Sequence, residues 1–165
     1  MLLLVQYTLI FASVLILVAL GGCFSEHSGV INLGLEGIMV IGALGGALAM
    51  RMLTGIVSGA AMVLLVLLAA IVFGVAYSAL LGAASINFKA DQTLVGTALN
   101  LLGTAGATVI VKAINTAANP DDVSSTVQYV EAKKAFLLNI NGFEFNWFML
   151  IAVLAVVAAY VTLYK

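Results

Sequence analysis

The chain has 165 residues, of which 64% are hydrophobic and 8% charged, and its mean hydropathy is +1.24. This composition excludes a soluble globular domain and is typical of an integral protein of the lipid bilayer. A formal net charge of -1 without a cationic run gives no surface for nucleic acid, and the single cysteine, Cys23, excludes an intrachain disulfide.

Uncharged stretches divide the chain into candidate membrane spans. Apolar windows at about 2–22, 56–82, 93–112 and 146–164 each approach the roughly 20 residues that cross the hydrocarbon core. A fifth window, 37–53, is shorter and glycine-rich, and it reaches full length only with residues from the motif before it. We therefore predict an all-α membrane fold with about five transmembrane helices, the second of them irregular.

Residues 21–39 place two carboxylates, a histidine, an asparagine and five glycines between apolar stretches. An ionisable side chain inside a bilayer costs at least ~2.5 kcal/mol, so Glu36 is expected to line a cavity, find a partner or take part in transport. Backbone leaves the helix at membrane depth only where protein or a water-filled cavity satisfies its polar groups. Gly29, Gly34 and Gly37 are therefore the predicted positions of a broken or re-entrant segment.

Two conformations of this segment predict a polar pathway. If residues 28–36 are helical, their spacing of four puts Ser28, Asn32 and Glu36 on one face. If they are unwound, backbone groups face the cavity instead, as in transporters with discontinuous helices. The alternative is that Asn32 and Glu36 bond neighbouring helices and only lock their packing, as polar residues in membranes often do.

Other kinds of chemistry find little support in the residues. His27 is either a proton carrier near neutral pH or a solvated residue at the membrane boundary. Since the sequence groups no metal ligands and sets no nucleophile beside a base, we predict neither a metal site nor catalysis. Glycines at small-residue spacing predict close helix contacts instead: Gly42, Gly45 and Gly46, together with Gly55 and Gly59.

The window at 93–112 follows a capping residue, because Asp91 is placed to cap a helix that begins at Gln92. Asn100 lies near the middle of this window, and its neighbours on the same polar stripe are threonines: Thr93, Thr97, Thr104 and Thr108. Threonines in membrane helices commonly bond their own backbone, so the costlier asparagine is more informative. Contact with a transported solute and helix packing are equally compatible with Asn100.

Residues 113–145 are more polar, and we predict that they form a loop outside the bilayer. The run Asn119-Pro-Asp-Asp122 predicts a turn. Asn141-Gly142 between two apolar runs predicts a tight β-hairpin, which either covers the helix ends or contacts a partner protein.

Two ordered blocks carry a resemblance to a known family. Phe24-Ser-Glu-His-Ser-Gly-Val-Ile-Asn-Leu-Gly-Leu-Glu-Gly-Ile-Met-Val-Ile-Gly-Ala43 resembles the signature of ABC importer permeases of the nucleoside and simple-sugar branch, which are related to ribose and branched-chain amino-acid permeases. Ala90-Asp-Gln-Thr-Leu-Val-Gly-Thr-Ala-Leu-Asn-Leu-Leu102 is similar to the family segment built around Asp-Gln, Gly-Thr and Asn-Leu-Leu.

The resemblance implies that residues 1–165 are a single transmembrane domain, the N-terminal half of a permease in a bacterial or archaeal cell membrane. Such a permease pairs with a second, like or related permease and with a cytoplasmic ABC ATPase, which holds the ATP and Mg²⁺, so no cofactor is expected on this chain. A solute-binding protein outside the membrane delivers the solute. Nucleosides are the expected solute, and four residues are the expected contacts along the path: Ser28, Asn32, Glu36 and Asn100.

Ribose-like sugars are the alternative solute, and a passive channel or a non-transporting structural subunit is the alternative role. The family's next loop is cytoplasmic, which puts residues 113–145 outside and the turn at Lys89 inside, although the cation count opposes the positive-inside tendency. A chain that ends at Lys165 is expected to lack the loop that docks on the ATPase.

Overall fold

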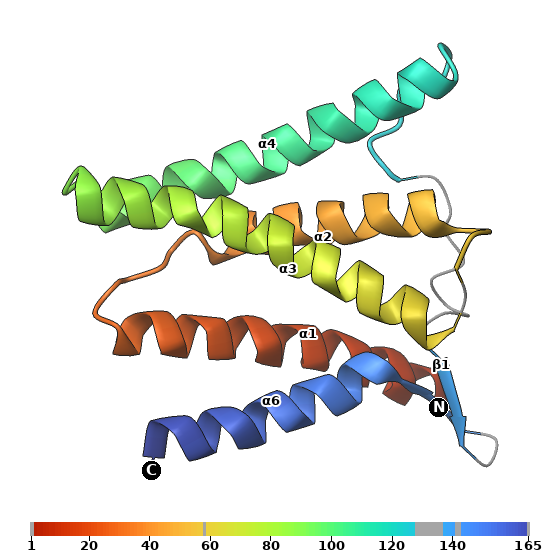
Figure 1. Cartoon of the computed structure of the whole chain (residues 1–165), viewed down its shortest axis with the longest axis horizontal. Helices are drawn as coiled ribbons and strands as arrows, with labels where there is room; N and C mark the ends of the chain where they lie inside the picture. Colours follow the sequence, from red (N-terminus) through yellow and green to blue (C-terminus); the bar gives the residue numbers. More distant parts are fainter. Residues whose placement is uncertain (1, 58, 128–136, 141–142, 165) are drawn as a thin grey trace. The chain divides into compact units, whose positions relative to one another are not determined.

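A computed structural model describes residues 2–57, 59–127, 137–140 and 143–164. In chain order its elements are α1 (Leu2–His27), α2 (Leu35–Leu53), α3 (Ala60–Gly82), the π-helical turn η1 (Ala83–Asn87), α4 (Gln92–Ala118), β1 (Leu137–Ile140), β2 (Phe143–Asn146) and α6 (Trp147–Tyr164) (Figure 1).

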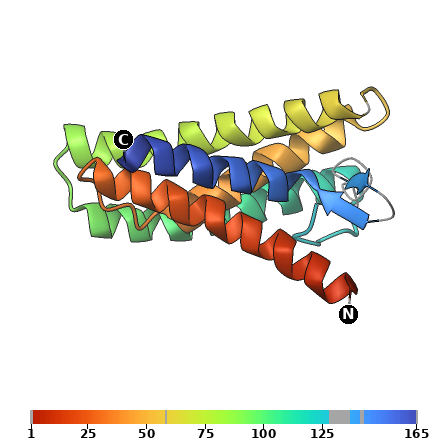
Figure 2. The same cartoon turned by 90° about the horizontal axis from the view of Figure 1, so that it is seen from below.

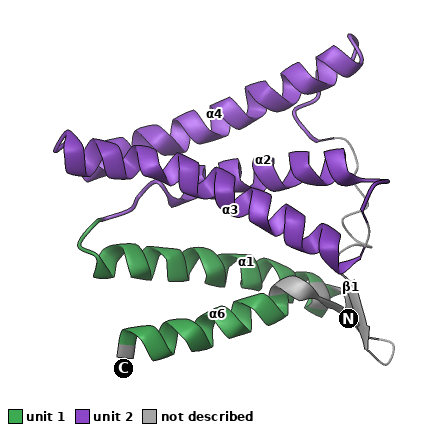
Figure 3. Cartoon of the chain, in the orientation of Figure 1, with its two compact units in different colours: residues 1–30, 133–165 green, residues 31–132 purple. Residues whose placement is uncertain are grey.

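The chain divides into two compact units, coloured green and purple in Figure 3. Unit 1 comprises Met1–Val30 and Lys133–Lys165, and within it α1 and α6 lie side by side (Figure 2). Unit 2 comprises Ile31–Ala132, and within it α2 packs on both α3 and α4. The candidate functional site belongs to unit 2.

Four helices of the described chain are long and apolar enough to cross a membrane: 7–27, 35–53, 60–87 and 92–118. Large apolar side chains such as Phe11 and Leu101 are exposed, at 68% and 74%. That exposure suits helices whose solvent is lipid, since such helices are apolar on every side. The predicted helical membrane fold is thus confirmed, with four spans of full length. The described apolar part of α6, Met149–Leu163, is shorter.

Within unit 1, β1 and β2 pair in antiparallel register, with Leu137 opposite Asn146 and Ile140 opposite Phe143. The predicted turn residues Asn141 and Gly142 lie outside the described residues. The helix α4 continues beyond Lys112 to Ala118, so the first residues of the segment 113–145 are helical.

Asp91 begins α4 as predicted. Its carboxylate accepts hydrogen bonds from the backbone N–H groups of Thr93 and Leu94 at 2.8 and 3.2 Å, which satisfies two donors that the helix itself leaves free. At the other end of α4, the predicted turn closes when the N–H of Asp122 donates to the carbonyl of Asn119 at 2.9 Å.

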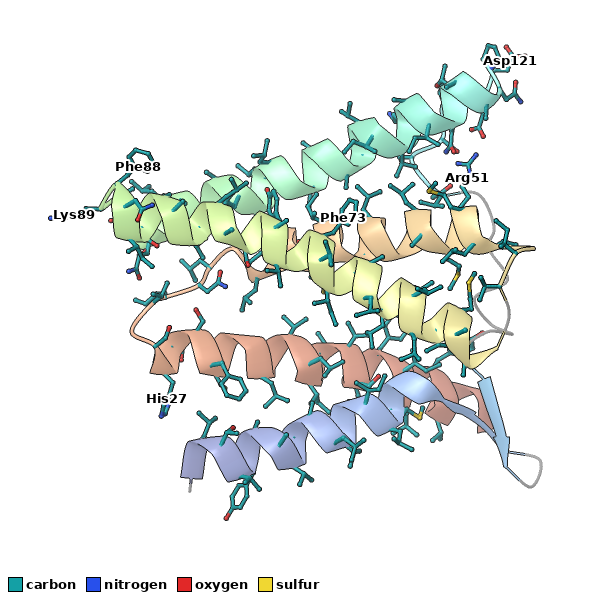
Figure 4. The ribbon with its side chains drawn as sticks, viewed as in Figure 1. His27, Arg51, Phe73, Phe88, Lys89 and Asp121 are labelled. Carbon is teal, nitrogen blue, oxygen red and sulfur yellow. The ribbon has the colours of Figure 1, made fainter. Side chains whose placement is uncertain are left out.

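The α2–α3 contact uses the glycines predicted for close approach. A Cβ atom on Gly42 would lie 3.2 Å from the carbonyl oxygen of Ala70, and one on Gly45 would overlap the ring of Phe73 (Figure 4). Gly55 and Gly59 play a different part from the one predicted. They lie in the connection between α2 and α3 with φ of 88° and 68°, so they serve the turn and not a helix contact.

Candidate functional site

The backbone between α1 and α2 is not helical at residues 28–34, so the segment adopts the unwound alternative, and the helical face joining Ser28, Asn32 and Glu36 does not form. Gly29 ends α1 with φ of 81°: its N–H donates to the carbonyl of Glu26, and the N–H of Val30 donates to the carbonyl of Ser25. These two bonds make a Schellman cap, in which glycine meets no steric penalty. The cap therefore pairs the carbonyls of Ser25 and Glu26 in the last turn of the helix.

The predicted residues near this break either form local hydrogen bonds or lie at the start of α2. In unit 1, the Ser28 hydroxyl donates to the carbonyl of Ser25 at 2.6 Å, so it closes a local turn. In unit 2, the side-chain oxygen of Asn32 accepts a hydrogen bond from the N–H of Gly34 at 3.0 Å, immediately before α2. Gly34 and Gly37 differ, because Gly34 precedes the helix whereas Gly37 lies inside its first turn and does not break it.

The side chain of Asn100 on α4 forms hydrogen bonds to the backbone at the start of α2. Its amide oxygen accepts from the N–H of Gly37 at 2.7 Å, and its amide nitrogen donates to the carbonyl of Leu33 at 2.7 Å. Buried backbone groups without a partner are expensive in an apolar medium, and the first N–H groups of a helix have no partner of their own. One side chain thus satisfies a donor and an acceptor of the unwound segment. Of the two roles open for Asn100, this geometry favours packing.

Two further side chains hold the same region. The side-chain oxygen of Gln92, in the first turn of α4, accepts from the N–H of Ile31 at 2.8 Å. The hydroxyl of Tyr77 on α3 donates to the carbonyl of Leu99 at 2.7 Å. The sequence did not identify either residue, because each partner is a backbone group far along the chain.

Glycine-to-glycine contact brings α2 and α4 together beside Asn100. A Cβ atom on Gly37 would lie 2.6 Å from the carbonyl oxygen of Leu99, and one on Gly103 would lie 2.8 Å from the Cα of Gly37. Any side chain at these positions would meet backbone, which cannot move aside. Beyond the contact, the two helices diverge in Figure 1.

Glu36 is the exposed acidic residue in the first turn of α2. No hydrogen bond or ion pair joins its carboxylate to another residue of the described chain. The positive end of the helix dipole favours an anion there. His27, also exposed, lies in unit 1 at the end of α1.

The space where α2 and α4 diverge is partly filled by residues 123–127, which we call the return segment. Val127 packs against the buried cluster of Leu44, Ala107 and Val111. Asn115, which is 0% exposed, holds the segment: its amide nitrogen donates to the carbonyls of Ser124 and Thr126 at 3.1 and 2.8 Å and to the Ser124 hydroxyl at 3.1 Å. Asn115 could not be identified from the sequence, since its position three residues before the end of α4 gives no signal of burial.

An open-sided cavity of about 350 Å³ lies between α2, α4 and the return segment, and some of its lining residues, such as Thr108 and Ser125, are exposed. It is lined by Val40, Ala43, Leu44, Ala47, Thr104, Ala107, Thr108, Val111, Ser125 and Val127. Among the described residues, no group of three or more metal-ligating side chains accompanies it. The threonines bond their own helix as predicted.

A family model for the permease component of branched-chain amino acid transport systems matches residues 4–165. The chain belongs to this family. Its members are permease components of transport systems and not enzymes, and this permease chain is a multi-pass membrane protein.

Three relatives of this permease chain have names that state a solute. It is 47% identical over 119 residues to the guanosine ABC transporter permease protein NupQ of Bacillus subtilis. This alignment covers 72% of the chain and 37% of the relative. It is 38% identical over 97 residues to the nucleoside ABC transporter permease protein NupC of Lactococcus lactis, covering 59% and 30%. The putative glucose ABC transporter permease protein TsgC13 of Haloferax volcanii is 38% identical over 93 residues, covering 56% and 26%.

The aligned part of the chain spans 37% or less of the length of these three permeases. No solved structure matches the chain.

Proposed function

We propose that this chain is the N-terminal part of the permease of an ATP-driven importer of nucleosides. The observation that carries the proposal is the 47% identity to a guanosine permease over 119 residues, supported by the second nucleoside permease among the relatives. Each of these two alignments covers less than two fifths of the relative's length. We therefore propose that the complete permease has more chain than the matched region.

The polar residues at the start of α2 and on α4 have separate roles in this proposal. Glu36, exposed and unbonded within the described chain, contacts the solute or its water along the path. Asn32 and Asn100 hold the irregular backbone open beside it, because their amides bond Gly34, Leu33 and Gly37. Ser28 lies at the approach to this segment in the sequence, and its contact with solute is part of the proposal.

The partners are those of an ABC importer. A second permease completes the channel, a cytoplasmic ATPase supplies the energy from ATP and Mg²⁺, and a solute-binding protein presents the nucleoside. No cofactor is assigned to this chain. In the membrane of a bacterial or archaeal cell, α6 makes a fifth crossing in addition to the four long helices, and β1 with β2 forms a short hairpin outside the bilayer.

A sugar solute is the second candidate, and the observation that favours it is the 38% identity to the putative glucose permease. The alignment to that relative is shorter and less identical than the one to the guanosine permease. We therefore rank nucleosides first. A structural subunit without a path is the third candidate.

Uptake of labelled guanosine and labelled glucose tests the ranking in cells that carry the complete permease with its ATPase and binding protein. Nucleoside import predicts guanosine uptake that disappears when the ATPase is made unable to hydrolyse ATP. Glucose uptake alone would keep the mechanism and change the solute. Uptake of neither solute, with the permease present in the membrane, would favour the structural role.

A further inference from the structure

The cavity between α2, α4 and the return segment has a size and lining suited to a small polar molecule. Its volume of about 350 Å³ falls in the range of roughly 300–1,000 Å³ found for small-molecule sites. The α2 wall is formed by the apolar residues Val40, Ala43 and Ala47. The hydroxyl groups all belong to the other two walls.

The hydroxyls on α4 are already committed as donors. Thr104 donates to the carbonyl of Asn100 at 2.9 Å, and Thr108 donates to the carbonyl of Thr104 at 2.8 Å. Each oxygen keeps lone pairs that can accept. This wall therefore favours a molecule that presents O–H or N–H donors to it.

The third wall is held in place by a buried side chain. Ser125 lies on the return segment between Ser124 and Thr126, both of which are bonded by the wholly buried amide of Asn115. Asn115 thus holds the backbone on both sides of Ser125, a residue that lines the same cavity as Thr104 and Thr108.

We propose that this cavity is a solute subsite that takes a nucleoside, with the ribose hydroxyls donating to Thr104 and Thr108 and the base against the apolar wall of α2. The inference rests on the proposed nucleoside transport and adds the residues that select the sugar part. A free sugar carries hydroxyls on all sides, and those facing the α2 wall would lose their hydrogen bonds to water without replacement. A nucleoside has one apolar face and one hydroxyl-bearing end, which matches the two walls.

The test compares uptake of guanosine with uptake of 2′,3′-dideoxyguanosine, which lacks two donor hydroxyls. Both solutes are given to the complete transporter with its ATPase and binding protein, as wild type and as Thr104→Val and Thr108→Val. We expect each variant to lower guanosine uptake relative to the dideoxy compound by about three- to tenfold, the effect of one neutral hydrogen bond. The binding protein is the same throughout, so its own preference cancels in this ratio.

Thr97→Val is the matched control. Its hydroxyl also donates to its own helix, to the carbonyls of Thr93 and Leu94 at 3.0 and 2.9 Å, but it does not line the cavity. The control should leave the uptake ratio unchanged. Ser125→Ala changes the wall formed by the return segment and should also lower guanosine uptake relative to the dideoxy compound. This variant keeps the test possible if the α4 variants do not reach the membrane.

An unchanged ratio in the cavity variants, with normal guanosine uptake by the wild type, would overturn the subsite. If helices of the complete permease fill the cavity, the substitutions disturb helix packing and lower the uptake of both solutes equally. The ratio of guanosine to dideoxyguanosine uptake is then unchanged, which also overturns the subsite. Absence of guanosine uptake by the wild type would instead overturn the nucleoside function on which the subsite depends.

Discussion

The side chain of Asn100 provides backbone hydrogen bonds that water would provide at a helix start in a soluble protein. The start of α2 presents a backbone N–H at Gly37 and a carbonyl at Leu33, and the amide of Asn100 is complementary to both at 2.7 Å. A side-chain amide offers a donor and an acceptor on two separate atoms at neutral charge. A hydroxyl has both functions on a single oxygen atom and a carboxylate only accepts, so neither group matches the two separate partners as the amide does.

Asn100→Ala should destabilise the permease. Both backbone groups lose their partner, and the penalty of roughly 1–3 kcal/mol for an unsatisfied buried group applies to the N–H of the buried Gly37, whereas Leu33 is exposed. We expect a fall of several degrees in the melting temperature of the purified permease in detergent. Thr97→Val, which removes an exposed hydroxyl from the same helix, should leave it nearly unchanged. Equal melting temperatures for Asn100→Ala and wild type would contradict this role.

Glu36 is expected to contribute to transport and not to folding, because it is exposed and no described residue bonds it. Glu36→Gln should lower uptake by the complete transporter about tenfold or more, the loss of a hydrogen bond to a charged group. Glu36→Leu should still assemble, which is measured by its amount in the membrane and its elution as a single species. Normal uptake by Glu36→Gln together with failed assembly of Glu36→Leu would favour the packing role.

At the scale of elements, the contact between α2 and α4 depends on glycine on both sides. Helices in lipid gain little from the hydrophobic effect between them, so close backbone approach through small residues replaces it. Gly37 and Gly103 provide that approach, since a Cβ atom on either would lie under 3.0 Å from backbone atoms of the other helix.

Gly103→Ala and Gly106→Ala form a matched pair on α4. A Cβ atom at Gly103 would lie 2.8 Å from the Cα of Gly37, whereas one at Gly106 has nothing within 4 Å. We expect Gly103→Ala to lower the melting temperature, because α2 must move away. Gly106→Ala should leave it unchanged or raise it slightly, since alanine is favoured over glycine in a helix by about 0.5–1 kcal/mol. The reverse order of melting temperatures would contradict the contact.

Local signals in the sequence predicted local structure well. The cap at Asp91, the threonines bonded to their own helix and the interruption at Gly29 and Gly34 each depend on residues within a few positions of one another. The role of Asn100 could not be read in the same way, because its backbone partners are 63 and 67 residues away. The positions of Gly55 and Gly59 were misread because spacing alone does not distinguish a turn glycine from a helix-contact glycine.

At the scale of the molecule, the membrane-capable helices of unit 2 fix which connections share a side of the bilayer. Figure 4 places Phe88 and Lys89 at one end of the unit and Arg51 and Asp121 at the other. If α2, α3 with η1, and α4 each cross the bilayer, as their lengths allow, successive connections alternate between its two sides.

Cysteine labelling in sealed vesicles tests this arrangement. In a Cys23→Ser background, Ile56→Cys and Asp121→Cys should react with a membrane-impermeant maleimide from one side, and Phe88→Cys from the opposite side. Ile56 and Phe88 are suitable because they are 78% and 81% exposed. Labelling of all three from the same side would contradict three complete crossings. The family orientation further predicts that the side carrying Phe88 is cytoplasmic.

The glycine contact between α2 and α4 also has a mechanical consequence. From Gly37 to Met50, α2 extends for roughly 13 residues, an arm of about 20 Å at 1.5 Å per residue. A tilt of about 10° around the contact would displace the far end of that arm by about 3.5 Å, while the atoms at the contact itself would barely move. If α2 tilted in this way, the close contact of Gly37 with Gly103 would be the pivot, and a small rotation there would give a displacement at the far end comparable to the width of a water molecule.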